Sequence, residues 1–127
     1  MGMEVSMFFT FWGLSAIKRK TVYKGKPITG KLMAAMLPSG PGSVGTSRMN
    51  MMGLGPAFFR KMMKKNKVES LPELIDQAVE MGVRLVACRM SMDVLGMKEE
   101  ELIDSVEYGG VATYLGDASD SKISLFI

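Results

Sequence analysis

Residues 70–88, SLPELIDQAVEMGVRLVAC, predict a helix followed at once by a strand. Ser70 and Glu73 have the spacing of a capping box, which is typical of a helix N-terminus. An apolar stripe at helical spacing follows, made of Leu71, Leu74, Ile75, Ala78 and Val79. Gly82 is a natural helix end, and the apolar strand after it ends at Cys88. Helices that alternate with short apolar strands predict an α/β domain with a mainly parallel sheet.

The segments on either side of residues 70–88 continue this alternation. We expect the first strand at residues 4–10, where EVSMFFT lacks a polar/apolar alternation, as in a strand buried on both faces. Further helical patterns occupy residues 13–20, 31–37, 56–67, a stretch from about Ser91, and 98–106, and KISLFI at residues 122–127 predicts a final strand.

The composition limits the class of protein. The 127 residues are 47% hydrophobic and 23% charged, which suits one domain spanning residues 1–127 and argues against disorder of the whole chain. The formal charge of +3 at pH 7 is too small to predict nucleic-acid binding. No stretch reaches the roughly 20 apolar residues of a membrane span, and no secretory signal pattern is present. We therefore predict a cytoplasmic protein with neither a nucleic-acid partner nor a membrane span.

The cysteine and histidine counts exclude several kinds of site. The chain has one cysteine, Cys88, and no histidine. One cysteine cannot form an intrachain disulfide or a cysteine cluster around a metal. Without histidine there is no His-ligated metal, Ser-His-Asp triad or Cys-His dyad. We expect no metal and no other cofactor, and any thiol chemistry must activate the sulfur without an imidazole.

Cys88 ends a predicted strand just before a predicted helix, and two interpretations are open. Ligands of open α/β sheets bind outside the carboxyl ends of the strands, and a helix N-terminus together with Arg89 would favour the thiolate over the thiol. Ser91 is a good N-cap for this helix, whereas Asp93 would partly oppose the positive field. Free cysteine is also among the most buried residue types, so Ala87-Cys88 could equally complete the core.

Gly109 and Gly110 take a position that parallels that of Cys88. They lie in EYGGVATYLG, residues 107–116, where a strand ends before a helical turn. They would then form another wall of the same crevice. The alternative is a tight turn that requires a positive φ.

Two other segments carry weaker signals. The loop at residues 38–56 is rich in glycine but matches neither a P-loop nor a dinucleotide fingerprint, so we favour a flexible lid or a subunit contact over an anion-binding loop. The run from Arg60 to Lys67 holds five basic residues. These could contact nucleic acid, an acidic partner or a membrane surface, although a solvated helix face is the favoured interpretation.

A repeated pattern suggests a sheet that extends beyond the first predicted strand. MGMEVSMFF at residues 1–9 superposes on MGVRLVACR at residues 81–89, where the Met-Gly pair closes a helix. By analogy we expect an upstream strand and helix, with strand 4–10 paired beside the strand of Cys88. A true start at Met1, directly before an edge strand, is the open alternative.

Four motifs together resemble the DsrE/DsrF-like family. They are FFTFWGL at residues 8–14, MNMMGLG at 49–55, SLPELIDQAVEMGVRLVACRMSMDVLGM at 70–97 and GGVATYLGDA at 109–118, and the similarity runs along essentially the whole chain. The nearest branch is the one labelled peroxiredoxin-like or sulfurtransferase. The resemblance implies a flavodoxin-like (Rossmann-like) α/β domain, with helices on both faces of a mainly parallel sheet, that forms homo-oligomers. Members usually have an additional strand and helix before the first residue of this sequence.

The resemblance also implies that Cys88 carries sulfane sulfur as a persulfide, in a sulfur carrier or sulfurtransferase. The substrate-binding residues would be Arg89, Ser91, Trp12, Gly109 and Gly110. The partners would be sulfur donor and acceptor proteins or small sulfur species. Two other functions are open: a non-catalytic oligomeric interaction module that docks a partner through helix 56–67, and a thiol-based redox protein. A thiol peroxidase is disfavoured because VACRMSM lacks a Pro-framed cysteine with an activating Thr.

Overall fold

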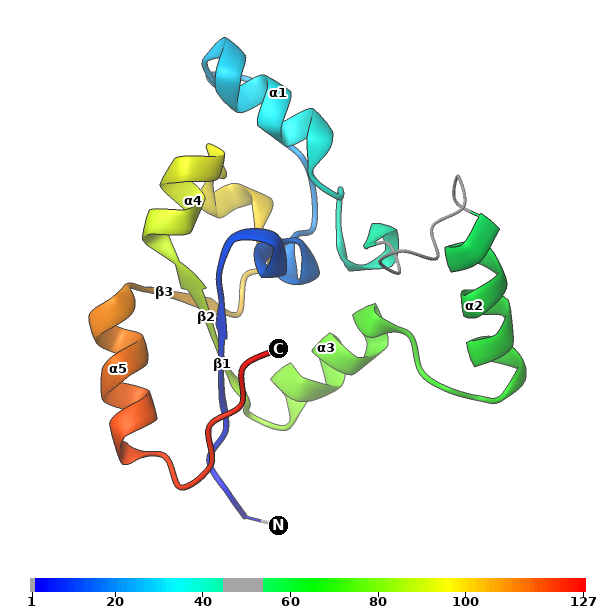
Figure 1. Ribbon diagram of the computed structural model, residues 1–127, viewed down its shortest axis with the longest axis vertical. Helices are drawn as coiled ribbons and strands as arrows, with labels where there is room; N and C mark the ends of the chain where they lie inside the picture. Colours follow the sequence, from blue (N-terminus) through cyan, green and yellow to red (C-terminus); the bar gives the residue numbers. More distant parts are fainter. Residues whose placement is uncertain (1, 45–53) are drawn as a thin grey trace.

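The computed structural model describes residues 2–44 and 54–127. The elements follow one another as β1 (Ser6–Phe9), η1 (Phe11–Ile17), α1 (Ile28–Met36), η2 (Pro41–Ser43), α2 (Leu54–Lys65), α3 (Leu71–Glu80), β2 (Arg84–Cys88), α4 (Arg89–Leu95), η5 (Glu99–Glu101), β3 (Val106–Gly109) and α5 (Val111–Asp120), where η marks a short 3-10 helix. The strands lie at the centre, with α5 on one side and η1 and α3 on the other (Figure 1).

The sheet of the described residues has three parallel strands in the order β1-β2-β3. Phe9 of β1 lies beside Ala87, and Cys88 lies beside Gly109 of β3. The predicted α/β class, with a parallel sheet and helices on both faces as in the flavodoxin-like fold, is therefore confirmed. The predicted pairing of the first strand with the strand of Cys88 is also confirmed. β1 is an edge strand of this sheet.

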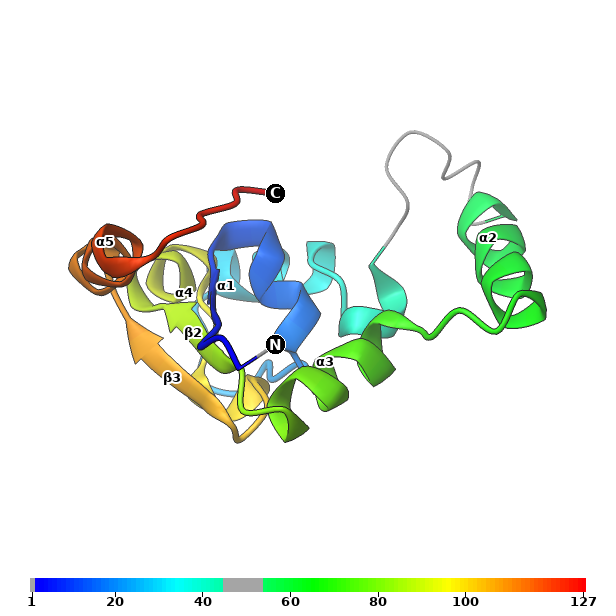
Figure 2. The same ribbon diagram turned by 90° about the horizontal axis from the view of Figure 1, so that it is seen from below.

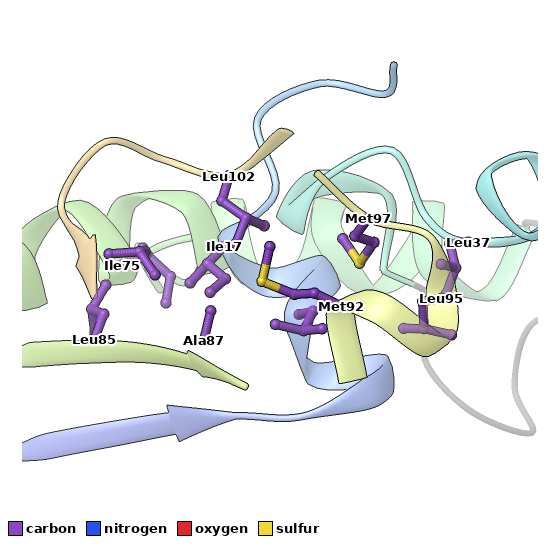
Figure 3. Close-up of a cluster of buried hydrophobic side chains, with 11 residues drawn as sticks. Ile17, Leu37, Ile75, Leu85, Ala87, Met92, Leu95, Met97 and Leu102 are labelled. Carbon is purple, nitrogen blue, oxygen red and sulfur yellow. The ribbon is translucent and has the colours of Figure 1, made fainter. Parts of the chain in front are cut away.

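The main core lies between the sheet and the layer of η1 and α3. Leu85 and Ala87 point from β2 into this layer, where they pack with Ile17 of η1 and Ile75 of α3 (Figure 3). Each fully buried aliphatic side chain of this kind stabilises the fold by about 1.5–3 kcal/mol. Because side chains alternate along a strand, Val86 points to the opposite face.

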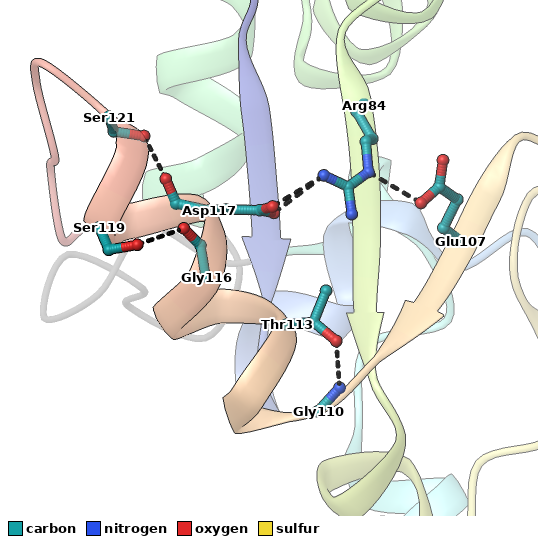
Figure 4. A network of polar contacts seen from close by, with 8 residues as sticks. All are labelled: Arg84, Glu107, Gly110, Thr113, Gly116, Asp117, Ser119 and Ser121. Carbon is teal, nitrogen blue, oxygen red and sulfur yellow. Dashed lines mark hydrogen bonds and ion pairs between the residues drawn. The ribbon is translucent and has the colours of Figure 1, made fainter.

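The opposite face of the sheet is covered by α5. The Phe8 and Tyr114 rings pack with their centroids 5.4 Å apart. Arg84 donates hydrogen bonds at 3.0 Å to both carboxylate oxygens of Asp117, and its Nε donates to Glu107 at 2.8 Å (Figure 4). These contacts join α5 and β3 to the central strand.

Several of the helices predicted from local patterns are confirmed. α1 and α2 occupy the expected segments, and Ser70 and Glu73 form the predicted capping box of α3. Ser70 donates to the Glu73 carboxylate from its backbone N–H at 2.6 Å and from its hydroxyl at 2.7 Å. Of the predicted loop at residues 38–56, residues 45–53 lie outside the described part, as does most of the motif at 49–55.

Three predicted elements are wrong in extent or type. The first strand covers four residues and is exposed or half-buried, because an edge strand is only partly covered by the flanking layers. The predicted helix at 98–106 is only the short turn η5, because the Glu101 carboxylate turns inward to the Lys26 ammonium. The last residues, 122–127, form no strand and are exposed.

Candidate functional site

The carboxyl ends of the three strands meet at one edge of the sheet, and Cys88 lies there as the last residue of β2. Its neighbour across the sheet is Gly109, the last residue of β3. The connections that leave this edge lead to Trp12 in η1 and to Gly110 before α5. The structure therefore brings the predicted site residues to the edge at which open α/β sheets bind ligands.

Cys88 is a free thiol and only 4% exposed. Alternation along β2 puts its side chain on the same face as Val86 and Arg84, away from the main core cluster. Arg84 reaches Asp117 of α5, so this is the face that α5 covers. A large donor or acceptor therefore reaches the sulfur only after a local movement of the residues that cover it.

Helix α4 begins at Arg89, directly after the strand. Cys88 itself is the N-cap residue, with extended backbone angles (φ −73°, ψ 112°). The prediction that Ser91 caps this helix is wrong, because the strand continues into the helix without a loop and the cap falls three residues earlier. Ser91 is buried in the first turn. The N–H groups of residues 89–91 have no acceptor within the helix and are close along the chain to the sulfur, but the dipole of a seven-residue helix is weak.

The Arg89 guanidinium has two partners on the side of β3. Its Nη1 lies 3.0 Å from Glu99 Oε1, and its Cζ lies 5.1 Å from the centroid of the Tyr108 ring. Burial, followed by the charge of Glu99, raises the pKa of the Tyr108 hydroxyl, so this ring remains neutral at physiological pH. The charge of Arg89 is thus partly compensated. Glu99 and Tyr108 were missed in the sequence, where the only signal was the position of Tyr108 directly before Gly109.

A hollow of about 270 Å³ opens beside α4. It is lined by Arg89, Met92, Asp93, Met97, Lys98 and Glu99. The lining has two cationic and two anionic side chains, so its net charge is zero. The two methionines are almost fully buried. Cys88 does not line the hollow, which begins at the neighbouring Arg89. The hollow is therefore an approach to the strand-end edge rather than a pocket around the sulfur.

Exposed apolar side chains surround the strand-end edge. Trp12 is 60% exposed, and Phe11, Met90 and Val111 are also exposed in the first turns that follow β1, β2 and β3. Phe11 has a φ of 41°, in the left-handed region that few non-glycine residues adopt, where the chain turns sharply out of β1. The sequence pattern had no sign of this strained turn.

Gly109 and Gly110 do follow a strand and precede a helix, as predicted. The alternative of a tight turn with positive φ is wrong, because neither glycine has one. Gly109 instead packs closely, since an added Cβ would lie 3.0 Å from the Thr113 side chain. Gly110 is the N-cap residue of α5, and its N–H donates to Thr113 Oγ1 at 3.4 Å.

The described ranges lack two kinds of feature. Within residues 2–44 and 54–127, no group of three or more His, Cys, Asp or Glu side chains is placed to hold a metal ion. None of the helices in these ranges has the length and apolar character needed to cross a membrane. The predicted compartment and the roles of the individual site residues stay predictions.

Fold and site define an α/β protein with its single thiol at the carboxyl edge of a parallel sheet. The chain belongs to the DsrE/DsrF/DrsH-like family, whose model matches residues 1–126, so the predicted family is confirmed. It is 45% identical over 125 residues to the uncharacterized protein YrkE of Bacillus subtilis (strain 168). The matched region covers 98% of this chain and 78% of YrkE. It is 34% identical over 131 residues to the sulfur carrier protein DsrE2 of Allochromatium vinosum. This matched region covers 100% of this chain and 81% of DsrE2.

Proposed function

We propose that the chain is a sulfur carrier or sulfurtransferase that holds sulfane sulfur as a persulfide on Cys88. A sulfur-related role is supported by the family and by the name of DsrE2 as a sulfur carrier protein. The single observation that carries the proposal is the position of the only cysteine, at the strand-end edge of the sheet.

The chemistry is an exchange in which no external oxidant or reductant takes part. The Cys88 thiolate attacks the outer sulfur of a donor, a protein persulfide or thiosulfate, and the S–S bond forms as the donor bond breaks. The electron pair of the broken bond leaves with the donor thiolate or with sulfite. An acceptor thiolate then attacks the outer sulfur on Cys88, becomes a persulfide and restores the Cys88 thiolate.

The remaining predicted residues would bind the donor and acceptor around this sulfur. Trp12 would contribute an exposed apolar surface, and Arg89 would attract an anionic donor. Ser91 is buried, so it would act through its backbone N–H in the first turn of α4. Gly109 and Gly110 would form the wall on the side of β3.

Intact-mass spectrometry after incubation with polysulfide or thiosulfate tests the proposal. The wild-type chain should gain one sulfur atom, and the acceptor thiol dithiothreitol should remove it. Cys88→Ser should fold with an unchanged circular dichroism spectrum and gain none. Sulfur loading that persists in Cys88→Ser would refute the proposal, because the chain has no other cysteine.

The low exposure of Cys88 favours a second candidate, the non-catalytic interaction module with an inert thiol. In that case neither polysulfide nor peroxide would modify Cys88 in the folded chain, whereas both would modify it in urea. A sulfenic adduct on Cys88 after peroxide, without sulfur loading, would instead support the thiol-based redox protein. Mass spectrometry of the peptide that contains Cys88 separates the three functions, because peroxide also adds oxygen to the exposed methionines.

A further inference from the structure

Helix α2 lies far from the strands of the sheet and stands away from the rest of the molecule (Figure 2). Pro56 in its first turn is the only buried residue of the helix. Nothing in the proposed sulfur chemistry uses α2, so its surface needs a separate explanation.

The surface of α2 has an apolar half, with cations on the other half and at the border. At 3.6 residues per turn, the apolar half carries Leu54, Phe58, Phe59, Met62 and Met63. Arg60 and Lys64 lie on the other half, Lys61 lies at the border beside Leu54, and Lys65 lies between Leu54 and Phe58. The apolar half is open to solvent, since Leu54 is 72% exposed, Phe58 66% and Phe59 49%. An amphipathic helix in a folded chain normally covers its apolar half with the core, but among residues 2–44 and 54–127 nothing covers the apolar half of α2.

The charge of α2 is of one sign only. Residues 54–67 contain five basic residues and no acidic residue, whereas the other residues of the chain contain 11 basic and 13 acidic residues. In the described part of the chain, none of these five cations forms an ion pair. Arg60 donates only to the Gly42 carbonyl, at 3.1 Å. The positive charge of α2 is therefore available to an external anionic surface.

We propose that α2 docks the protein onto an anionic lipid surface, lying in the plane of the headgroups. The apolar half, centred near Met62, would enter the boundary between headgroups and acyl chains, and the lysines at its border and on the other half would contact lipid phosphates. A short helix with aromatic residues on its apolar half and cations as its only charged residues has the composition of an interfacial helix. This inference does not depend on the sulfur chemistry of Cys88.

Charge complementarity favours a lipid surface over a second copy of the chain and over nucleic acid as the partner of α2. A second copy of α2, packed through its apolar half, would bring the five cations of each copy together. The exposed apolar stripe of α1 in a second copy could also cover α2, but it is flanked by the cation Lys31 and offers no compensating charge. Nucleic acid would need the aromatic side chains among the cations, whereas in α2 Phe58 and Phe59 lie on the side away from Arg60 and Lys64.

Co-sedimentation of the full chain with vesicles tests the proposal. The protein should bind vesicles of phosphatidylcholine mixed with phosphatidylglycerol, and should bind phosphatidylcholine vesicles at least tenfold more weakly. Raising the salt should weaken the binding because it screens the charges. Phe58→Ser with Phe59→Ser should lower the affinity at least tenfold. Lys61→Glu with Lys64→Glu should abolish binding, since each lost cation alone costs about fivefold.

A matched control is Lys20→Glu with Lys122→Glu, which makes the same charge change at exposed positions outside α2. It should retain at least half of the vesicle binding. Equal loss in the control, equal binding to both kinds of vesicle, or no binding at all would overturn the proposal. So would a fall in the light-scattering mass of the Phe58→Ser/Phe59→Ser variant, which would make the apolar half an interface between copies.

The depth of insertion can be read directly with one tryptophan. Trp12→Phe with Phe58→Trp moves the only tryptophan of the chain onto the apolar half of α2. Its emission should shift to the blue on anionic vesicles, while the emission of Trp12 in the wild-type chain should change less. Emission from position 58 that stays unchanged while the protein sediments with the vesicles would rule out docking through α2.

Discussion

The Lys26 ammonium lies 2.6 Å from the Glu101 carboxylate, and the side chains of both residues are almost fully buried. Glu101 also accepts hydrogen bonds from the backbone N–H groups of Val22 and Lys98, at 3.0 and 2.8 Å. Lys18 Nζ lies 3.9 Å from the other carboxylate oxygen and has no hydrogen-bond partner among the described residues. One carboxylate therefore ties the segment after η1 to the turn beside α4.

Replacing Glu101 or Lys18 should have opposite effects on stability. Glu101→Gln leaves the buried Lys26 ammonium without its counter-ion and should lower the free energy of unfolding by about 3–5 kcal/mol. Burial lowers the pKa of Lys18 and outweighs the attraction of Glu101, so the charge of Lys18 is costly in the fold. Lys18→Met should leave the free energy of unfolding unchanged or raise it by about 1 kcal/mol. Urea unfolding measures both, and a large loss in Lys18→Met would show that its ion pair is stabilising.

Stability should fall in acid, and Glu101 should be responsible for part of the fall. Burial acts to raise the pKa of Glu101, but the hydrogen bonds from Lys26, Val22 and Lys98 outweigh it and hold the pKa below its ordinary value of 4.5. A carboxyl whose pKa is lower in the folded state stabilises the fold above the unfolded pKa. This contribution is lost as the pH falls through the folded pKa. Urea midpoints between pH 7 and pH 3 should therefore fall less in Glu101→Gln than in the wild-type chain, and parallel curves would contradict this account.

Local patterns in the sequence predicted the parts of the fold that short-range forces determine. The capping box of Ser70 and Glu73 and the apolar stripe after it lie within one helix, so the sequence shows them directly. Glu101 looked like part of a helical run of glutamates, but its partner Lys26 is 75 residues away in the chain. No periodicity reports such a contact, and so the helix at 98–106 was predicted wrongly.

The candidate site was predictable in position but not in detail. A strand that leads into a helix placed Cys88 at the ligand-binding edge of the sheet. The face of the sheet on which Cys88 is buried is covered by α5, which Arg84 joins to the strand through Asp117, and the partners of Arg89 come from η5 and β3. These contacts join segments whose spacing in three dimensions is set by the sheet register rather than by sequence proximity.

Gly109 and Gly110 should differ in their tolerance of a methyl group. In Gly109→Ala the new Cβ would lie 3.0 Å from three atoms of the Thr113 side chain, which must move by a few tenths of an ångström, at a cost of about 1–3 kcal/mol. Gly110→Ala is the matched control, because its Cβ would meet nothing within 4 Å and its φ is −122°. Thermal unfolding should separate the two variants. Equal effects would show that the close packing of Gly109 is unimportant.

The protein should self-associate through α1. The chain exposes 9417 Å². A monomer of its mass exposes about 6,700 Å², and the difference is of the size that stable oligomers bury. Ile28, Leu32 and Met36 form an exposed apolar stripe along α1. Leu32→Glu should lower the mass measured by light scattering at micromolar concentration, whereas Lys31→Glu, beside it, should not. A wild-type chain that is already monomeric would refute this prediction.

Arg89 and Glu99 should have opposite effects on the loading of Cys88 from an anionic donor. The Arg89 guanidinium is the cation next along the chain to the thiol, and its ion pair with Glu99 at 3.0 Å competes with any incoming anion. Arg89→Gln should slow sulfur loading from thiosulfate about tenfold, the effect of one charged hydrogen bond. Glu99→Gln should free the guanidinium and speed the loading. Intact-mass time courses measure both rates, with a neutral trisulfide donor as the control that neither change should affect. If thiosulfate loading is the same in both variants, Arg89 serves only to join α4 to Glu99 and Tyr108.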